Sequence, residues 1–275
     1  MSLKIASLNS VSNGNCYYIA NENEAVLIDV GISLKEIERR MFRIGVNIQK
    51  VKAIFISHEH IDHVRGVEGT SRRNNIPVYI SEGTLRSSQV KIDDGLIRSF
   101  EEHKPVAVGN LNVTAFGKRH DAADPYSFVV EGNGVTIGVM TDIGSVCENT
   151  IAYFKCCNAA FLEANYDDEM LANGRYPAFL KERIAGDHGH LSNKQALDLF
   201  VNHKAGYMSL LLPSHLSRDN NNPKLVQDLF EAHAGKTKIV VASRDTATPV
   251  FTITNELNDG EFNIESADNQ QYSLF

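Results

Sequence analysis

The chain has 275 residues and is 43% hydrophobic, enough for one large core or two smaller ones. Its net charge is −7, from 27 basic and 34 acidic side chains, which excludes a generally basic nucleic-acid-binding surface but not a local basic patch. Neither an apolar run of roughly 18 residues nor an export leader is visible, so we expect a soluble, cytoplasmic protein without membrane partners.

The first third of the chain is rich in short strands. Apolar runs bounded by polar turn residues predict strands over residues 3–8, 16–19, 25–28 and 53–57. Asp29 directly follows the third of these strands. Before the fourth strand, Ser33 and Glu36 have the spacing of a capping box and are followed by a helical apolar pattern, so we predict a helix that begins at Ser33.

Three histidines and an aspartate follow the fourth strand within six residues, in the segment His58-Glu59-His60-Ile61-Asp62-His63. His58 and His60 are two residues apart, so in an extended stretch their side chains leave on the same side. Asp62 and His63 come after the chain turns and can face a second point nearby. Imidazole and carboxylate are ligands that zinc prefers, which favours a two-metal site over a solvated histidine-rich loop.

Two hairpins are predicted in the middle of the chain. One covers residues 106–116 and turns at Gly109-Asn110, and the other joins strands 127–130 and 135–139 through residues 132–134. His120 follows the first hairpin and Asp142 the second. Taken alone, a loop histidine is more often a surface residue, and an aspartate near a glycine is more often a turn residue.

Helices and strands alternate in the last third. Ser192 and Gln195 predict a capped helix, a strand over 207–212 ends near His215, Pro223 predicts the start of another helix, and strands are expected at 238–241 and 250–253. We expect one domain over residues 1–254, with two sheets and helices outside them. Residues 255–275 carry five acidic side chains and no Lys or Arg, which favours a frayed tail or an added edge element. The four cysteines show no Cys-x-x-Cys pair and are expected to be reduced.

The pattern His-x-His-x-Asp-His resembles the signature of the metallo-β-lactamase-fold hydrolases. The resemblance implies an α/β fold, a four-layer αββα sandwich of two mixed β-sheets flanked by helices. It also implies two metal sites in a fixed order along the chain. The first would use His58, His60 and His120, the second would use Asp62, His63 and His215, and Asp142 would lie between the two ions.

The same resemblance gives Asp29 the role of orienting the histidine-rich loop by hydrogen bonds, with an ordinary turn aspartate as the alternative. It implies two divalent cofactor ions, zinc first, with manganese, iron or nickel as alternatives. Histidine at position 60, where the oxygen-reducing diiron branch typically has glutamate, favours hydrolysis. No cysteine replaces a metal ligand, which separates the chain from secreted β-lactamases.

Three further segments resemble the YycJ/WalJ-type branch of this family, which implies 5′-to-3′ exonucleolytic hydrolysis of DNA. They are the Leu162–Asp167, Gly189–Asn193 and His215–Asn221 segments. We expect catalytic roles for Asp62, Asp142 and His190, and for Glu163 either the orienting of His190 or an unrelated polar contact, between which the sequence does not decide. Substrate contacts are expected from His190, Ser192, Asn193 and Arg218. The alternatives are a capped helix start for Ser192 and Asn193 and a solvated side chain for Arg218.

Three functions remain open at this point. The leading one is a phosphodiesterase acting on DNA or RNA by in-line attack of a hydroxide that bridges the two metals. The second is a small-molecule hydrolase of a thioester, lactone or phosphonate ester, and the third is a non-catalytic metal-binding scaffold. Scattered basic residues could form a local groove for nucleic acid: Arg72, Arg73, Lys118, Arg119, Arg175, Lys181 and Arg183. The sequence leaves the oligomeric state open.

Overall fold

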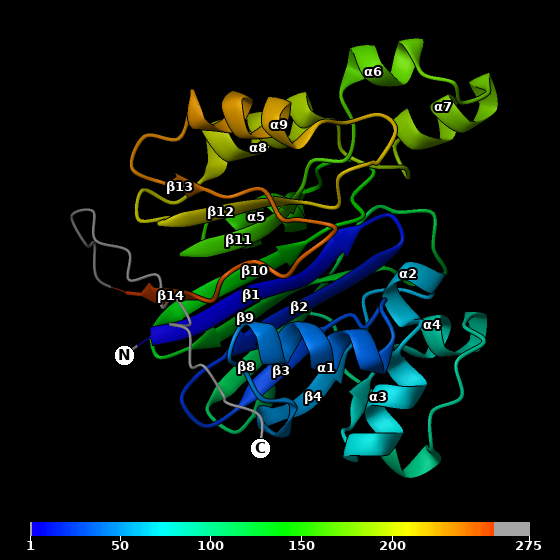
Figure 1. Cartoon of the computed structure of the whole chain (residues 1–275), viewed down its shortest axis with the longest axis vertical. Coiled ribbons are helices and arrows are strands. Elements are labelled where there is room, and N and C mark those ends of the chain that lie inside the picture. Colours follow the sequence, from blue (N-terminus) through cyan, green and yellow to red (C-terminus); the bar gives the residue numbers. More distant parts are fainter. Residues whose placement is uncertain (1, 256–275) are drawn as a thin grey trace, which may run out of the picture.

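The computed structural model describes residues 2–255, and two seven-stranded sheets face each other at its centre (Figure 1). The first sheet has the order β14 (Phe251–Thr254), β1 (Ser2–Val11), β2 (Gly14–Ala20), β3 (Ala25–Ile28), β4 (Val51–Phe55), β5 (Val78–Tyr79) and β6 (Ile97–Arg98). The second has the order β13 (Lys238–Ile239), β12 (Leu210–Ser214), β11 (Ala159–Glu163), β10 (Val135–Met140), β9 (Tyr126–Gly132), β8 (Leu111–Gly117) and β7 (Val106–Val108).

Both sheets are mixed in the same way. From β14 to β3 the neighbouring strands run antiparallel, and from β3 to β6 they run parallel. In the second sheet, β7 to β10 are antiparallel and β10 to β13 are parallel. This arrangement confirms the predicted pair of mixed sheets.

Helices cover the outer faces of both sheets. The described helices are α1 (Leu34–Arg43), α2 (Ile61–Val64), α3 (Val67–Asn74), α4 (Glu82–Ser87), α5 (Glu148–Phe154), α6 (Asp168–Asn173), α7 (Ala178–Ala185), α8 (Asn193–His203) and α9 (Pro223–Glu231), with short 3₁₀ turns at Ile48–Lys50 and Asp94–Leu96. None of them is both long and apolar enough to cross a membrane.

Three apolar layers hold the sandwich together. The central layer lies between the sheets and joins residues of both, such as Ile5 and Phe161. A second layer packs α5, α8 and α9 on the second sheet, and a third packs α1 and α3 on the first. The four-layer αββα sandwich expected from the family resemblance is therefore confirmed.

Local sequence signals explain many element boundaries. The predicted capping box is present at Ser192 and Gln195, and Ser33 caps α1 by accepting the Glu36 N–H. The β9–β10 hairpin turns through Asn133 and Gly134, which both have positive φ, as the tight hairpin turn requires.

Some elements and boundaries differ from the predictions. The strand expected at 207–212 is β12 (Leu210–Ser214), and α6 and α7 were not predicted at all. The α7 helix has eight residues and none is fully buried, so its apolar pattern is too short to predict a helix from the sequence. All four cysteines are unpaired in the structure. The proposed acidic tail, apart from Asn255, lies outside the described residues.

Candidate dinuclear metal centre and substrate pocket

Most of the predicted ligands, and the orienting residue Asp29, follow strands that end at the same edge of the sandwich. Asp29 follows β3, the His58–His63 segment follows β4, Asp142 follows β10 and His215 follows β12. The carboxyl ends of parallel strands are where open α/β sheets place their sites. Asp29, Asp142 and His215 have φ of 59°, 55° and 57°. This left-handed turn is rare outside glycine but tolerated by Asp and His, and it redirects the chain sharply where each strand ends.

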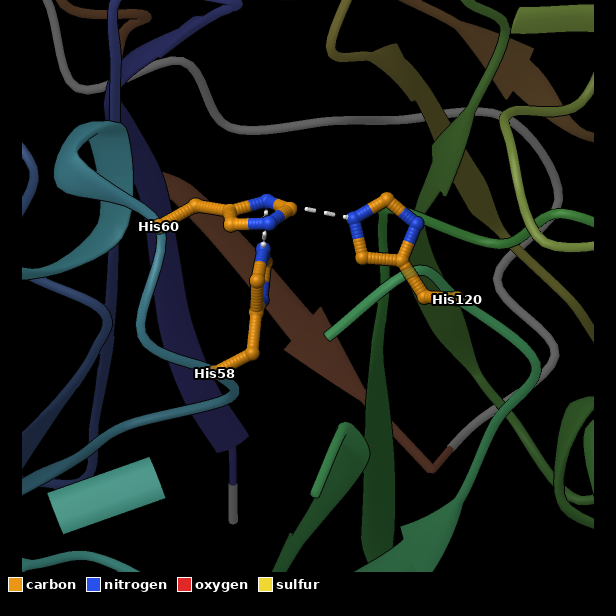
Figure 2. A group of neighbouring side chains, drawn as sticks. All are labelled: His58, His60 and His120. Atoms are coloured by element: carbon orange, nitrogen blue, oxygen red, sulfur yellow. Dashed lines mark hydrogen bonds between the residues drawn. The ribbon is translucent and has the colours of Figure 1, made fainter. Parts of the chain in front are cut away.

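The first cluster consists of His58, His60 and His120 (Figure 2). The Nε2 atom of His58 lies 3.1 Å from Nδ1 of His60, which lies 3.4 Å from Nε2 of His120. Three nitrogens bound tetrahedrally to one zinc ion would lie about 3.3 Å apart. The far nitrogens are engaged elsewhere, because Nδ1 of His58 contacts Ser57 Oγ and Nδ1 of His120 donates to the Gly189 carbonyl.

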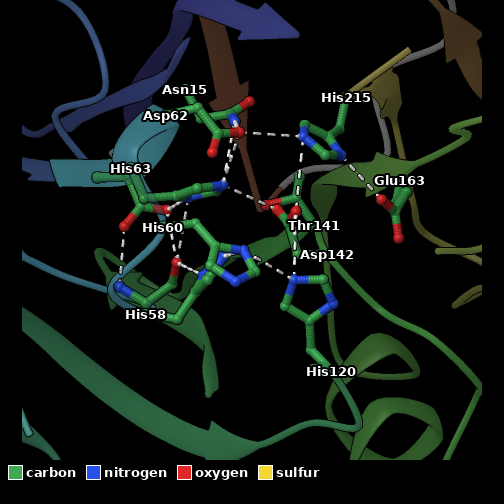
Figure 3. Close-up of polar contacts among 12 residues, drawn as sticks. Asn15, His58, His60, Asp62, His63, His120, Thr141, Asp142, Glu163 and His215 are labelled. Carbon is green, nitrogen blue, oxygen red and sulfur yellow. Dashed lines mark hydrogen bonds and ion pairs between the residues drawn. The ribbon is translucent and has the colours of Figure 1, made fainter. Parts of the chain in front are cut away.

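The second cluster consists of Asp62, His63 and His215, with Asp142 beside it (Figure 3). The Nε2 atom of His63 lies 3.4 Å from Asp62 Oδ2 and 3.2 Å from Asp142 Oδ2. Nε2 of His215 lies 3.6 Å from Asp62 Oδ2 and 3.5 Å from Asp142 Oδ1. Asp142 Oδ1 is also 3.8 Å from His120 Nε2, so this carboxylate lies between the two clusters.

These residues fit a pair of divalent cations. Asp142 Oδ2 and His215 Nε2 are buried atoms without a hydrogen-bond partner, although buried polar atoms are normally paired. Four carboxylates gather around the clusters, those of Asp29, Asp62, Asp142 and Glu163, and carry four negative charges that two divalent cations would balance.

Asp29 fixes the histidine-rich loop from behind. It is fully buried, and its Oδ1 accepts the Ser57 N–H at 2.8 Å. Its Oδ2 accepts the Ser57 hydroxyl at 2.8 Å and lies 2.8 Å from Nδ1 of His63. A proton on Nδ1 of His63 leaves Nε2 directed at the second cluster, which is the orienting contact expected of a carboxylate behind a metal ligand.

Glu163 links His190 to the second cluster. Its Oε1 lies 2.8 Å from Nδ1 of His190 and 2.9 Å from Nδ1 of His215, while Oε2 accepts the N–H groups of Ile143 and Leu191. Burial alone would raise the pKa of Glu163, but the charge of His190 and hydrogen bonds from both histidines lower it to about 2. Glu163 therefore stays ionised and holds both imidazoles in place.

Burial and charge act differently on the histidines of the two clusters. Burial lowers the pKa of His58 well below its usual value and that of His120 to about 4, so both rings are neutral. Burial opposes charge on His63 and His215 as well, but Asp142 and the neighbouring carboxylates raise the pKa of His63 well above its usual value and that of His215 to about 10. A cation bound at the second cluster would displace these protons, which couples metal binding to proton release.

Asn15, at the start of β2, is a site residue that the sequence analysis missed. Its Nδ2 donates to Asp62 Oδ2 at 3.2 Å and lies 3.1 Å from Nε2 of His63. Its Oδ1 accepts the Tyr17 hydroxyl, which contacts Ser10 Oγ. An asparagine beside a hairpin turn looks like an ordinary turn residue in the sequence, so no pattern separates it from one.

A cleft of about 250 Å³ opens onto the second cluster. Its lining includes His190, whose Nδ1 contacts Glu163 and whose Nε2 is therefore the nitrogen left for a substrate. One side is formed by Tyr176 and the helix α7, a structure that we call the α7 wall, through Leu180, Arg183 and Ile184.

The other predicted substrate contacts lie outside this lining. Ser192 and Asn193 are buried, and their side chains bond to the Gln195 N–H and to Asn221, which is the geometry of a helix start rather than of a substrate contact. Arg218 is exposed next to Ser217, which does line the cleft. Of the basic residues expected to form a groove, only Arg183 lines the cleft, whereas Lys118 is buried and donates to the Thr141 carbonyl.

The chain resembles known proteins in sequence and in fold. Residues 24–215 match the beta-lactamase superfamily domain. The chain is 33% identical to exodeoxyribonuclease YycJ of Bacillus anthracis over 232 residues, which cover 82% of this chain and 87% of that protein. It is 30% identical to exodeoxyribonuclease WalJ of Streptococcus pneumoniae over 263 residues, which cover 91% and 98%. Among solved structures, the metallo-beta-lactamase fold protein YhfI of Bacillus subtilis matches with a TM-score of 0.69 and 14% identity, over 90% of this chain and 99% of that one.

Proposed function

Because the chain belongs to the beta-lactamase superfamily, and within it to the YycJ/WalJ branch, we propose that it is an exonuclease that degrades DNA from the 5′ end. The family resemblance seen in the His58–His63 segment is thereby confirmed. The chain is a metal-dependent hydrolase, and its relatives over most of its length carry the name exodeoxyribonuclease.

The observation that carries this proposal is the position of Asp142 between two ligand clusters. Asp142 approaches His120 of the first cluster and both His63 and His215 of the second. A carboxylate has two oxygens and can serve two cations at once. We propose zinc as the ion at both clusters because imidazole nitrogens predominate among the donors.

Two divalent cations bound here would supply a water activated at neutral pH and would clamp the attacking and leaving oxygens of a phosphodiester. The chain's own residues do the rest. Asp29 and Glu163 hold the imidazoles of His63 and His215 in fixed orientations. His190, with Nδ1 held by Glu163, can present its Nε2 to a phosphate oxygen or donate a proton from it to the leaving oxygen.

The free cysteines bear on the compartment in which the protein works. We propose that the protein works in the cytoplasm, since all four cysteines are free, as expected in a reducing compartment. DNA is the proposed partner, and RNA is the nucleic acid against which it must be compared.

The decisive experiment incubates zinc-loaded protein with end-labelled single-stranded and double-stranded DNA and RNA, alongside a thioester and a lactone. We expect mononucleotides to leave the 5′ end of DNA first, and the Asp142→Ala variant to remain folded but inactive. Faster turnover of the thioester or lactone than of DNA would replace the nuclease with a small-molecule hydrolase. Full metal binding with no turnover of any substrate would mean that the protein is a non-catalytic metal-binding scaffold.

A further inference from the structure

The α7 wall lines the cleft although it contributes nothing to the core. The helix α7 has no buried residue, yet Leu180, Arg183 and Ile184 all face the cleft. In Figure 1, α6 and α7 project from the sandwich beyond the end of the second sheet. A helix whose apolar side chains are at most half-buried gains little from packing, so its position next to the proposed metal clusters calls for another explanation.

Polar contacts fix the α7 wall to the loops that carry site residues. The Tyr176 hydroxyl donates to Asp219 Oδ2 at 2.9 Å, in the loop after His215. Arg183 pairs with Asp121, directly after His120. The wall is therefore held at both ends by segments that also deliver predicted metal ligands.

Phe179 is exposed on this wall. The residue is 71% exposed, and it lies four residues before Arg183, one helical turn away on the same side of α7. Arg183 lines the cleft and Phe179 does not, so Phe179 lies one helical turn along α7 from a lining residue whose own side chain is 60% exposed.

The charge of this segment differs from that of the chain. Residues 174–186 contain the basic residues Arg175, Lys181 and Arg183 and one acidic residue, Glu182, in a protein whose net charge is −7. An exposed aromatic ring beside basic side chains is the combination that binds single-stranded nucleic acid, because the ring stacks on bases and the charges follow the phosphates.

We propose that the α7 wall binds the single-stranded end of a DNA substrate, with Phe179 stacked on a base near the scissile phosphate and Arg183 paired with a neighbouring phosphate. This inference rests on the proposed nuclease function and names the element that gives it preference for DNA over small diesters. Arg183 contacts Asp121 through Nε and its side chain is 60% exposed, so its terminal N–H groups can reach a phosphate.

The test compares Phe179→Ala with Phe42→Ala. Phe42 lies on α1 and is 85% exposed, so it offers an equally accessible phenylalanine away from the cleft. The measured quantity is the ratio of kcat/KM for a single-stranded DNA oligonucleotide to kcat/KM for bis(4-nitrophenyl) phosphate. We expect Phe179→Ala to lower this ratio about tenfold, mainly through KM for DNA, and Phe179→Trp to restore it. Phe42→Ala should leave the ratio unchanged.

Each other outcome has a definite meaning. If the wild-type protein cleaves DNA and Phe179→Ala behaves like Phe42→Ala, the α7 wall does not bind DNA, while the nuclease function stands. If Phe179→Ala lowers both activities equally, the residue supports the site rather than the substrate, and the proposal fails. If the wild-type protein cleaves only the small diester, the nuclease function fails and this inference fails with it.

Discussion

The proposed metal-ligand clusters and the α7 wall border the same cleft but are built in different ways. The clusters are largely buried, with only His60 and Asp62 partly exposed, and further hydrogen bonds hold Nδ1 of His63, His120 and His215. The α7 wall has no fully buried residue in its helix, and polar contacts of Tyr176 and Arg183 attach it to the neighbouring loops. The comparison suggests that the buried part determines which bond is broken and the exposed part determines which molecule is bound. Mutations should therefore have large effects on one side of the cleft and graded effects on the other.

The largest expected effect comes from Asp142→Asn. This change keeps the shape of the side chain but removes the charge that both clusters share. Loss of several kcal/mol of metal-dependent stabilisation of the transition state corresponds to a fall in kcat of at least about a thousandfold. The measurement is DNA hydrolysis together with zinc content per chain. A variant that retains two zinc ions and a rate within about tenfold of wild type would mean that Asp142 does not join the clusters.

A smaller but still large effect is expected from Glu163→Gln. One oxygen of the carboxylate contacts Nδ1 of both His190 and His215, and the other accepts two backbone N–H groups. If the amide oxygen of glutamine accepted from both imidazoles, its NH₂ group would face those backbone donors. Removing such a supporting contact typically lowers metal affinity by about 10- to 100-fold. Competition with a chromophoric chelator measures the affinity. Unchanged affinity in a correctly folded variant would show that His215 is oriented without Glu163.

Glu163 also predicts how the metal-free protein responds to acid. Its pKa is held at about 2, below the usual value of 4.5. A lowered carboxyl pKa contributes stability that is complete above the usual value and is lost as the pH falls through the folded value. Chelator-treated wild type should therefore lose more unfolding free energy than Glu163→Gln as the pH falls from 4.5 toward 2, as measured by denaturant titration. Equal losses in the two proteins would argue against this assignment.

The contrast between the two sides of the cleft also explains what the sequence could reveal. The His58–His63 segment is detectable because four ligand-type side chains crowd one loop after an apolar strand, and His120, Asp142 and His215 each follow a strand in the same way. Side chains that must lie close to an ion leave a recognisable spacing. The fold was predictable for a related reason, since its strands are continuous apolar runs with clear turns.

Other site features leave no such pattern. The left-handed turns at Asp29, Asp142 and His215 depend on tertiary structure and have no sequence signature beyond residue type. Asn15 contacts Asp62 across 47 positions of the chain, and only the fold brings the two together. The helix α7 escaped prediction because it is short and has no fully buried residue, so the residues proposed to select the substrate are those that a pattern of apolar spacing does not reveal.

Asn15→Ala tests whether this residue, which the sequence did not predict, supports the buried ligand clusters. The variant removes the donor to Asp62 Oδ2 and breaks a chain of contacts through Tyr17 to Ser10, whose Oγ accepts the His215 N–H. We expect zinc affinity to fall about tenfold. Asn13→Ala is the matched control, because Asn13 is exposed in the turn between β1 and β2. Equal zinc affinities in the two variants would mean that Asn15 serves only the β1–β2 hairpin and does not support metal binding.

The smallest effect is expected from Arg183→Ala, and it is measured most directly by the salt dependence of DNA binding. Binding of labelled single-stranded DNA, measured by fluorescence anisotropy in an Asp142→Asn background, should weaken with rising salt because phosphate contacts release counterions. Loss of one contact should reduce the slope of log affinity against log salt by about 0.7, whatever the DNA sequence. Arg73→Ala on α3, where the guanidinium side chain is 71% exposed, serves as the control. An unchanged slope in Arg183→Ala would mean that this guanidinium stays with Asp121 and that the exposed side of the cleft binds DNA without it.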